Sequence, residues 1–165
     1  MIDIHVLTHS GTRPDWLAQC LASMEGQPCT VHVLPGIEGN IAAGRQIGFG
    51  LGTHDYVAYV DSDDYLLPGC VQMALDALAS GVAAVVTDEL VTENEIVIAT
   101  KPYHHLHVVR RDVITPFLPT YGYEGKGLHC CVMLDRIAPA QRIATPGYVW
   151  RRDGHWSHIR ADLWY

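Results

Sequence analysis

Residues 56–69 read YVAYVDSDDYLLPG, and this stretch decides the fold class. Its first five residues form an unbroken apolar run, which is typical of a β-strand buried on both faces of a parallel sheet. Three carboxylates, Asp61, Asp63 and Asp64, follow directly at the carboxyl end of that strand. Because ligands of open α/β sheets bind beyond the carboxyl ends of the strands, the pattern predicts a binding site at this point.

A regular alternation of strands and helices surrounds the acidic stretch. Six further elements are predicted around it: strands at 2–8, 30–34 and 82–87, and helices at 14–24, 39–51 and 69–79. This order predicts an α/β fold in which a mostly parallel central sheet carries helices on both faces. Beyond residue 88 the alternation ends. Short strands at 93–100, 104–109 and 148–152 there predict a short antiparallel C-terminal part.

Size and composition fit one domain. The chain has 165 residues, 48% of them hydrophobic, so we expect a single domain over 1–165 with halves at 1–88 and 89–165. No apolar run is long enough for a membrane span, the first residues have no signal-peptide pattern, and the five cysteines form no CxxC pair. These features predict a soluble cytoplasmic protein with reduced thiols.

Charge is unevenly distributed along the chain. Residues 1–100 contain 2 basic and 13 acidic side chains, whereas residues 101–165 contain 9 and 5. The asymmetry favours a cation or sugar site in the first part and an anionic partner near the second. The alternative is that the surplus acids only keep the protein soluble.

The negative charge of the acidic motif must be compensated by neighbouring groups. Three carboxylates within four residues repel one another unless a cation or hydrogen-bond donors lie beside them, and a hard divalent ion with oxygen ligands can fill that role. If strand alternation continues through the motif, Asp61 and Asp63 project to the same side. The alternative is an acidic turn in which Asp64 faces a helix N-terminus.

Residues 1–80 resemble the nucleotide-binding half of inverting, family-2-like GT-A glycosyltransferases. The resemblance rests on Val6-Leu7-Thr8-His9 after the first strand, on Gly39-Asn40 and Gly44-Arg45 around the second helix, and on the strand with its acidic motif and Pro68. It implies the GT-A (nucleotide-diphospho-sugar transferase) fold. It also implies transfer of a sugar from a nucleotide-diphosphate donor, a UDP-sugar, to an acceptor hydroxyl with Mn²⁺ or Mg²⁺ as cofactor.

The resemblance also assigns roles to individual residues. It implies that Thr8 and His9 contact the base, that Asp61 lies at the ribose and shares the metal with Asp63, and that Arg45 faces the diphosphate or the site wall. The usual acid after the second strand is replaced here by Leu34-Pro35-Gly36, so only Glu38 could substitute for it. A solvated helix position is the alternative for Arg45.

The second half supplies the remaining candidates. Such enzymes need a carboxylate base for the acceptor hydroxyl, and Glu124 in TYGYEGKG is the first candidate, with Asp112 as the second. Arg151 and Arg152 could clamp the diphosphate, and His155 or His158 could bind the metal. The histidines of the HHLH segment, His104, His105 and His107, are interpreted as strand residues.

The sequence is compatible with several classes of acceptor. Small bacteriophage enzymes that glycosylate hydroxymethylated pyrimidines in DNA resemble this chain, which implies modified DNA as acceptor and the host cytoplasm as location. Basic and aromatic residues late in the chain fit that partner: Arg110, Arg111, Lys126, Arg151, Arg152, Trp156, Arg160 and Trp164. The alternatives are a saccharide or lipid-linked acceptor, or a degenerate domain that binds a nucleotide sugar without turnover. A Rossmann dehydrogenase is disfavoured because no GxGxxG follows the first strand.

Overall fold

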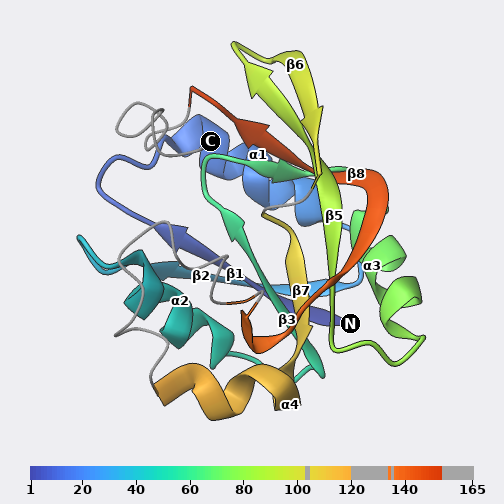
Figure 1. Ribbon diagram of the computed structural model, residues 1–165. Helices are drawn as coiled ribbons and strands as arrows, with labels where there is room; N and C mark the ends of the chain where they lie inside the picture. The colour runs from blue at the N-terminus through green and yellow to red at the C-terminus, as the bar shows by residue number, and fades with distance from the viewer. Residues whose placement is uncertain (103–104, 120–133, 135, 154–165) are drawn as a thin grey trace.

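The computed structural model describes residues 1–102, 105–119, 134 and 136–153. The strands among them are β1 (Ile2–Thr8), β2 (Cys29–Pro35), β3 (Tyr56–Asp61), β4 (Tyr65–Leu66), β5 (Ala84–Glu93), β6 (Ile96–Lys101), β7 (His107–Arg110) and β8 (Gln141–Arg151). The helices are α1 (Pro14–Met24), α2 (Ile41–Phe49), α3 (Cys70–Leu78), α4 (Arg111–Ile114) and the 3₁₀ turn η1 (Thr115–Phe117). Figure 1 shows their arrangement.

The described strands form one mixed sheet. Its order is β2-β1-β3-β7-β5-β8-β4, and β6 pairs with β5 beside this path. Strand β1 is parallel to both β2 and β3, and β5 is parallel to β8. Strand β7 lies between β3 and β5 and is antiparallel to both, so β1, β2, β3, β5 and β8 all run in one direction. The predicted α/β fold with a mainly parallel sheet is confirmed.

Helices cover both faces of this sheet, as predicted. On one face α1 and α3 pack against Ala58 and Val60 of β3, within a core that also contains residues of β1. On the other face Phe49 of α2 and Ile114 of α4 pack with Val57 and Tyr59 of the same strand. Successive side chains of β3 therefore enter opposite cores, which explains why the strand is an unbroken apolar run.

Two predicted details differ from the structure. The last strand is not part of an antiparallel segment, because β8 pairs parallel with β5 and antiparallel only with β4. Residues 65–66 form the short strand β4, where the sequence predicts only an interruption. The boundaries of α1 agree with the prediction, and α2 begins after Asn40, whose Oδ1 accepts a hydrogen bond from the amide of Ala43 at 3.0 Å.

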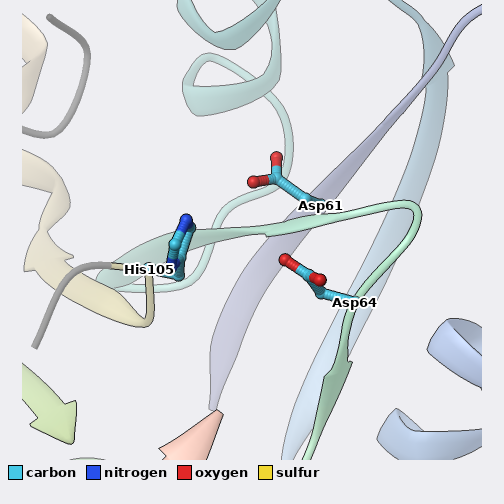
Figure 2. Close-up of side chains that lie close together, drawn as sticks. All are labelled: Asp61, Asp64 and His105. Carbon is cyan, nitrogen blue, oxygen red and sulfur yellow. The ribbon is translucent and has the colours of Figure 1, made fainter. Parts of the chain in front are cut away.

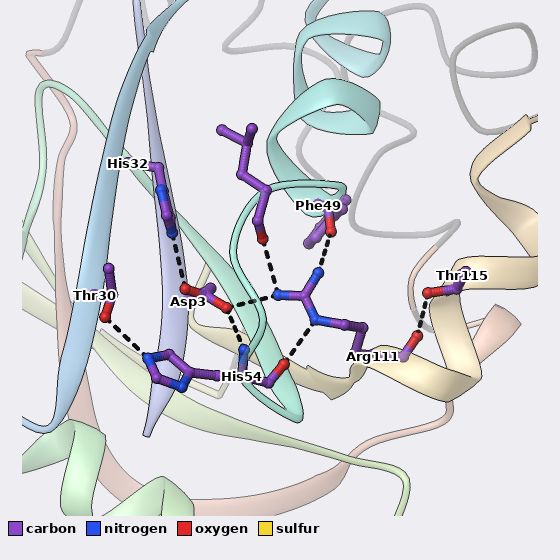
Figure 3. A network of polar contacts seen from close by, with 8 residues as sticks. Asp3, Thr30, His32, Phe49, His54, Arg111 and Thr115 are labelled. Atoms are coloured by element: carbon purple, nitrogen blue, oxygen red, sulfur yellow. Dashed lines mark hydrogen bonds and ion pairs between the residues drawn. The ribbon is translucent and has the colours of Figure 1, made fainter.

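A buried carboxylate ties the amino ends of the strands together (Figure 3). Asp3 of β1 is 3% exposed and accepts hydrogen bonds from Arg111 Nη2 and from the amide of His54, both at 2.7 Å. His32 Nε2 lies 2.8 Å from the other carboxylate oxygen. The Arg111 guanidinium also donates to the carbonyl oxygens of Phe49, Leu51 and His54. This network fixes the loop between α2 and β3 at the edge opposite the acidic motif.

Within the described part of the chain, no helix combines the length and the apolar composition that crossing a bilayer would require.

Candidate active site

The parallel direction of the strands gathers the site at one edge of the sheet. Thr8 ends β1, Asp61 ends β3 and Arg151 ends β8, so the loops that follow all lie beyond carboxyl ends. After Asp61 the chain turns at once, since the amide of Asp64 donates to the carbonyl oxygen of Asp61 at 3.0 Å. Strand alternation therefore stops at Asp61. The prediction that Asp61 and Asp63 project alike from a continuing strand is wrong for this reason.

Asp64 is the buried member of the motif. It is 1% exposed, and its two oxygens accept hydrogen bonds from the Tyr148 hydroxyl at 2.8 Å and from the amide of Arg151 at 2.7 Å. The same hydroxyl accepts a hydrogen bond from the amide of Asp61 at 3.1 Å. Burial, with the nearby charge of Asp63, raises the pKa of the Asp64 carboxyl. Tyr148 of β8 therefore joins two residues of the acidic turn and fixes its shape.

Asp61 is held by an arginine from α2. Arg45 Nη2 lies 2.6 Å from Asp61 Oδ1, and the guanidinium carbon lies 3.2 Å from the centre of the Tyr59 ring. Arg45 is 3% exposed, so the alternative of a solvated helix residue is wrong. The carboxylate of Asp61 keeps more contact with solvent, at 28% exposed. The Asp61 carboxylate can therefore contact a ligand while Arg45 fixes its position.

A histidine and a glutamate lie beneath the motif. His105 Nδ1 is 2.7 Å from Glu89 Oε2, and both residues are buried. The imidazole stacks on Tyr148 with ring centres 5.1 Å apart and on Trp150 at 5.7 Å. Although burial alone lowers the pKa of His105, the charge and hydrogen bond of Glu89 raise it to about 10. Glu89 therefore favours the cationic form of the imidazole.

Asp61, Asp64 and His105 also have spacing that could suit a metal ion (Figure 2). One ligand atom from each residue lies within 4.8 Å of the other two. Nδ1 of His105, however, is already engaged with Glu89, and both oxygens of Asp64 already accept hydrogen bonds. We therefore interpret this group as carboxylates compensated by the protein's own donors.

Asp63 points to a different place, a cleft of about 320 Å³. Asp63 and Asp153 contribute the carboxylates of the cleft, and the remaining wall comes from the β1–α1 loop and the start of α1: His9, Gly11, Thr12, Arg13 and Trp16. The Oδ1 atom of Asp153 is buried and has no hydrogen-bond partner within the described ranges. The cleft thus combines acidic oxygens with an aromatic ring and a guanidinium, which stack at 3.9 Å.

The β1–α1 loop has a defined shape that joins it to the motif. The amide of His9 donates to Thr12 Oγ1 at 2.8 Å, and the amide of Gly11 donates to His9 Nδ1 at 3.0 Å. Thr12 Oγ1 lies 3.3 Å from the hydroxyl of Ser62. Thr8 lies beside the loop, with Oγ1 3.4 Å from the carbonyl oxygen of Leu34. Glu38 is exposed in the turn between β2 and α2.

The two arginines at the end of β8 have different surroundings. Arg151 is 1% exposed, and its guanidinium donates to the Asp63 carbonyl oxygen at 2.6 Å, to Glu95 at 3.0 Å and to Gln19. It therefore supports the acidic turn from beneath. Arg152 is exposed, and its amide donates to the carbonyl oxygen of Thr92 at 2.8 Å.

The two predicted bases fall in different places. Asp112 lies in α4 and forms an ion pair with Arg110, which pairs with Tyr56 at the amino end of β3. The structure thus places Asp112 at the edge opposite Asp61 and does not bring the two together. Glu124, His155 and His158 lie outside the described residues.

Sequence reasoning missed the residues that surround the motif. The sequence patterns do not single out Tyr148, Glu89 or Asp153, and they predict His105 only as a strand residue, although it precedes β7. The HHLH segment gives only a weak indication of the role of His105: a histidine that is buried in a strand needs a hydrogen-bond partner elsewhere in the fold. The long-range pairing of β5 with β8, which brings Glu89 opposite Tyr148, cannot be deduced from local pattern.

Known proteins share this sequence pattern and this fold. Residues 10–134 match the model of glycosyl transferase family 2. No curated protein gives a match to the chain. Staphylococcus aureus TarS, as the 1–349 fragment with UDP-GlcNAc, superposes with a TM-score of 0.74 at 11% identity, over 96% of this chain and 60% of that one. The same fragment with UDP gives a TM-score of 0.69 at 11% identity, over 91% and 60%.

The structural match and the family match cover different shares of the compared proteins. The chain spans 60% of the solved TarS fragment, and at 11% identity that likeness concerns the fold alone. The family model, by contrast, covers most of the chain, including residues 10–13 of the β1–α1 loop, Arg45 and the whole acidic motif. The fold is the GT-A fold, and the chain belongs to glycosyl transferase family 2.

Proposed function

We propose that this protein transfers a sugar from a nucleotide-diphosphate donor, a UDP-sugar, to an acceptor hydroxyl, with a divalent cation as cofactor. The observation that carries the proposal is the acidic turn at the end of β3, in which Asp63 lines a cleft with the β1–α1 loop. Membership of family 2 supports transfer from a nucleotide sugar. The TarS fragment of similar fold contains UDP-GlcNAc, so that sugar nucleotide is the first donor to test.

The donor diphosphate and the cation would share the cleft. Asp63 and Asp153 both line it, and the buried Oδ1 of Asp153 has no hydrogen-bond partner in the part of the chain described. Carboxylate oxygens are the ligands that Mg²⁺ and Mn²⁺ prefer, so these residues fit the cofactor. When bound, the cation would neutralise charge that develops on the leaving diphosphate. His155 and His158 remain further proposed ligands.

The remaining roles follow from position. Asp61, fixed by Arg45 and 28% exposed, would accept a hydrogen bond from a ribose hydroxyl. Thr8 and His9 would lie toward the base, with Glu38 at the adjacent turn. Arg13 in the cleft, which is exposed although it pairs with Asp15, and the exposed Arg152 are the cations proposed for the diphosphate, because Arg151 is buried and engaged beneath the turn. Glu124 remains the proposed base, and direct attack of the acceptor would invert the anomeric configuration.

The acceptor proposal keeps modified DNA as one candidate. Three of the residues that suggest it, Arg110, Arg111 and Arg151, form ion pairs within the protein. The candidate therefore rests on Arg152 and on late residues outside the described ranges. Binding of duplex DNA that weakens steeply as salt rises supports it. No binding at low salt would favour a saccharide or lipid-linked acceptor.

Donor hydrolysis tests the function without knowledge of the acceptor. We expect release of UDP from one or more UDP-sugars, dependent on Mn²⁺ or Mg²⁺ and abolished in Asp63→Ala. Asp76→Ala is the matched control, since Asp76 is an exposed acid on α3, remote from the motif in the chain. Equal turnover in Asp63→Ala would overturn the role of that residue. Nucleotide-sugar binding with no turnover for any acceptor would instead indicate a degenerate binding domain.

A further inference from the structure

The Glu89–His105 pair is an ion pair buried next to the acidic turn. His105 is 8% exposed and Glu89 is 2% exposed, and their atoms Nδ1 and Oε2 are 2.7 Å apart. A buried ion pair contributes little net stability compared with apolar residues of the same shape. The fold therefore has no general need for charge at this place.

The ring of His105 is held by three neighbours. Glu89 holds Nδ1, and the ring stacks on Tyr148 and Trp150 at interplanar angles of 14° and 23°. Glu89 and Tyr148 face each other in the β5–β8 register, so one strand pair supplies both the ion-pair partner and a stacking ring. These contacts restrict the imidazole to one orientation, so its other nitrogen, Nε2, points in one fixed direction.

That position is beside the carboxylates. His105 has a ring nitrogen within 4.8 Å of an oxygen of Asp61 and of an oxygen of Asp64. In Figure 2 the imidazole faces the two carboxylates, which project from the two sides of the turn. Arg45 holds Asp61 from α2 at 2.6 Å, so His105 is a second basic side chain close to that carboxylate.

We propose that His105, oriented by Glu89, is a positioning residue that fixes the Asp61 carboxylate for the donor. The inference rests on the proposed function, in which Asp61 binds the ribose, and it adds a requirement for the Glu89–His105 pair. His105 does not touch the donor. It acts through Asp61, by restricting that carboxylate to the orientation that Arg45 also favours.

The test replaces the pair by apolar residues of similar shape. In the double variant Glu89→Met/His105→Phe the aromatic stack is kept and neither charge is left buried without its partner. We expect little change in the free energy of unfolding and roughly 10-fold weaker UDP binding in calorimetry, the factor for loss of about one hydrogen bond. His107→Phe is the matched control, since His107 is a buried histidine of β7. It should leave UDP binding unchanged.

A double-mutant cycle distinguishes positioning from general loosening of the site. If the pair acts through Asp61, its replacement has little further effect on UDP affinity in an Asp61→Asn background. Effects that simply add would overturn the proposal, as would an unchanged UDP affinity in the double variant.

A crystal structure of the same double variant gives a second result that does not depend on the function. We expect the Asp61 carboxylate, now restrained by Arg45 alone, to adopt a second orientation besides the one seen here. An unmoved carboxylate would overturn the positioning role even if the wild-type protein bound no nucleotide. Absence of UDP-sugar binding in the wild type, on the other hand, would count against the proposed function.

Discussion

Removal of one hydroxyl, in Tyr148→Phe, should measure how strongly the acidic turn is held. Tyr148 is fully buried, and phenylalanine fills the same space without creating a cavity. The change deletes a hydrogen bond to the Asp64 carboxylate at 2.8 Å and leaves the amide of Asp61 without its acceptor at 3.1 Å. Both groups lie where water has little access.

The magnitude follows from these two losses. A hydrogen bond to a charged group contributes about 1.5–3 kcal/mol, and a partly buried amide left unpaired costs about 1 kcal/mol more. We therefore expect a loss of about 2–4 kcal/mol in the free energy of unfolding, which in a protein of this size lowers the melting temperature by roughly 10 °C. Because the turn carries Asp63, metal-dependent UDP release should fall as well.

Urea unfolding followed by circular dichroism, with the slope compared between variants, provides the assay. Tyr56→Phe is the control, because the Tyr56 hydroxyl forms no hydrogen bond with any residue that the structure describes. If Tyr148→Phe lost less than about 0.5 kcal/mol, the hydroxyl would not join Asp61 and Asp64 as described, and the account of the turn would fail.

Three further changes test the framework around the site. Arg111→Met should lower the free energy of unfolding by about 3–5 kcal/mol, since it leaves the Asp3 carboxylate buried without its arginine; a near-neutral result in thermal unfolding would contradict this. Gly52→Ala should lower the free energy of unfolding by at least about 2 kcal/mol, because φ is +75° and the added Cβ would lie 2.1 Å from Asp3. Gly26→Ala is the control: its φ is +73° but its surroundings are open, so its loss in the same assay should be clearly smaller. Burial lowers the pKa of His107 to about 4. As pH falls below about 6.5, the imidazole is therefore protonated in the unfolded chain before it is protonated in the folded protein. The free energy of unfolding should drop by up to about 3 kcal/mol between pH 6.5 and 4. His107→Gln should flatten that part of the pH profile of urea unfolding, and an equally steep profile would exclude His107 as its source.

Local pattern predicted the first half of the fold well. The apolar run at 56–60 and the proline that begins α1 are signals read within a few residues, and each corresponds to an element of the structure. Parallel strands joined by helices allow few topologies, so the position of the acidic motif at a carboxyl edge followed from that pattern. The second half lacks such signals.

The surroundings of the motif depended on contacts between distant segments. Asp61, Asp63 and Asp64 look equivalent in the sequence, yet the tight turn sends Asp63 to the cleft and Asp64 into the core. Tyr148 and His105 reach the motif because β7 and β8 both lie beside β5, an arrangement that no local spacing specifies. Their roles depend on contacts with the buried carboxylates of Asp64 and Glu89.

The central claim is that Asp63 in the cleft holds a divalent cation that in turn binds a donor diphosphate. Titration calorimetry of UDP with the wild-type protein and with Asp63→Asn, each with Mn²⁺ and with chelator, tests it most directly. We expect Mn²⁺ to strengthen UDP binding by the wild type at least about 10-fold and to have no effect on UDP binding by Asp63→Asn. Equal Mn²⁺ dependence in both proteins, or none in the wild type, would contradict the claim.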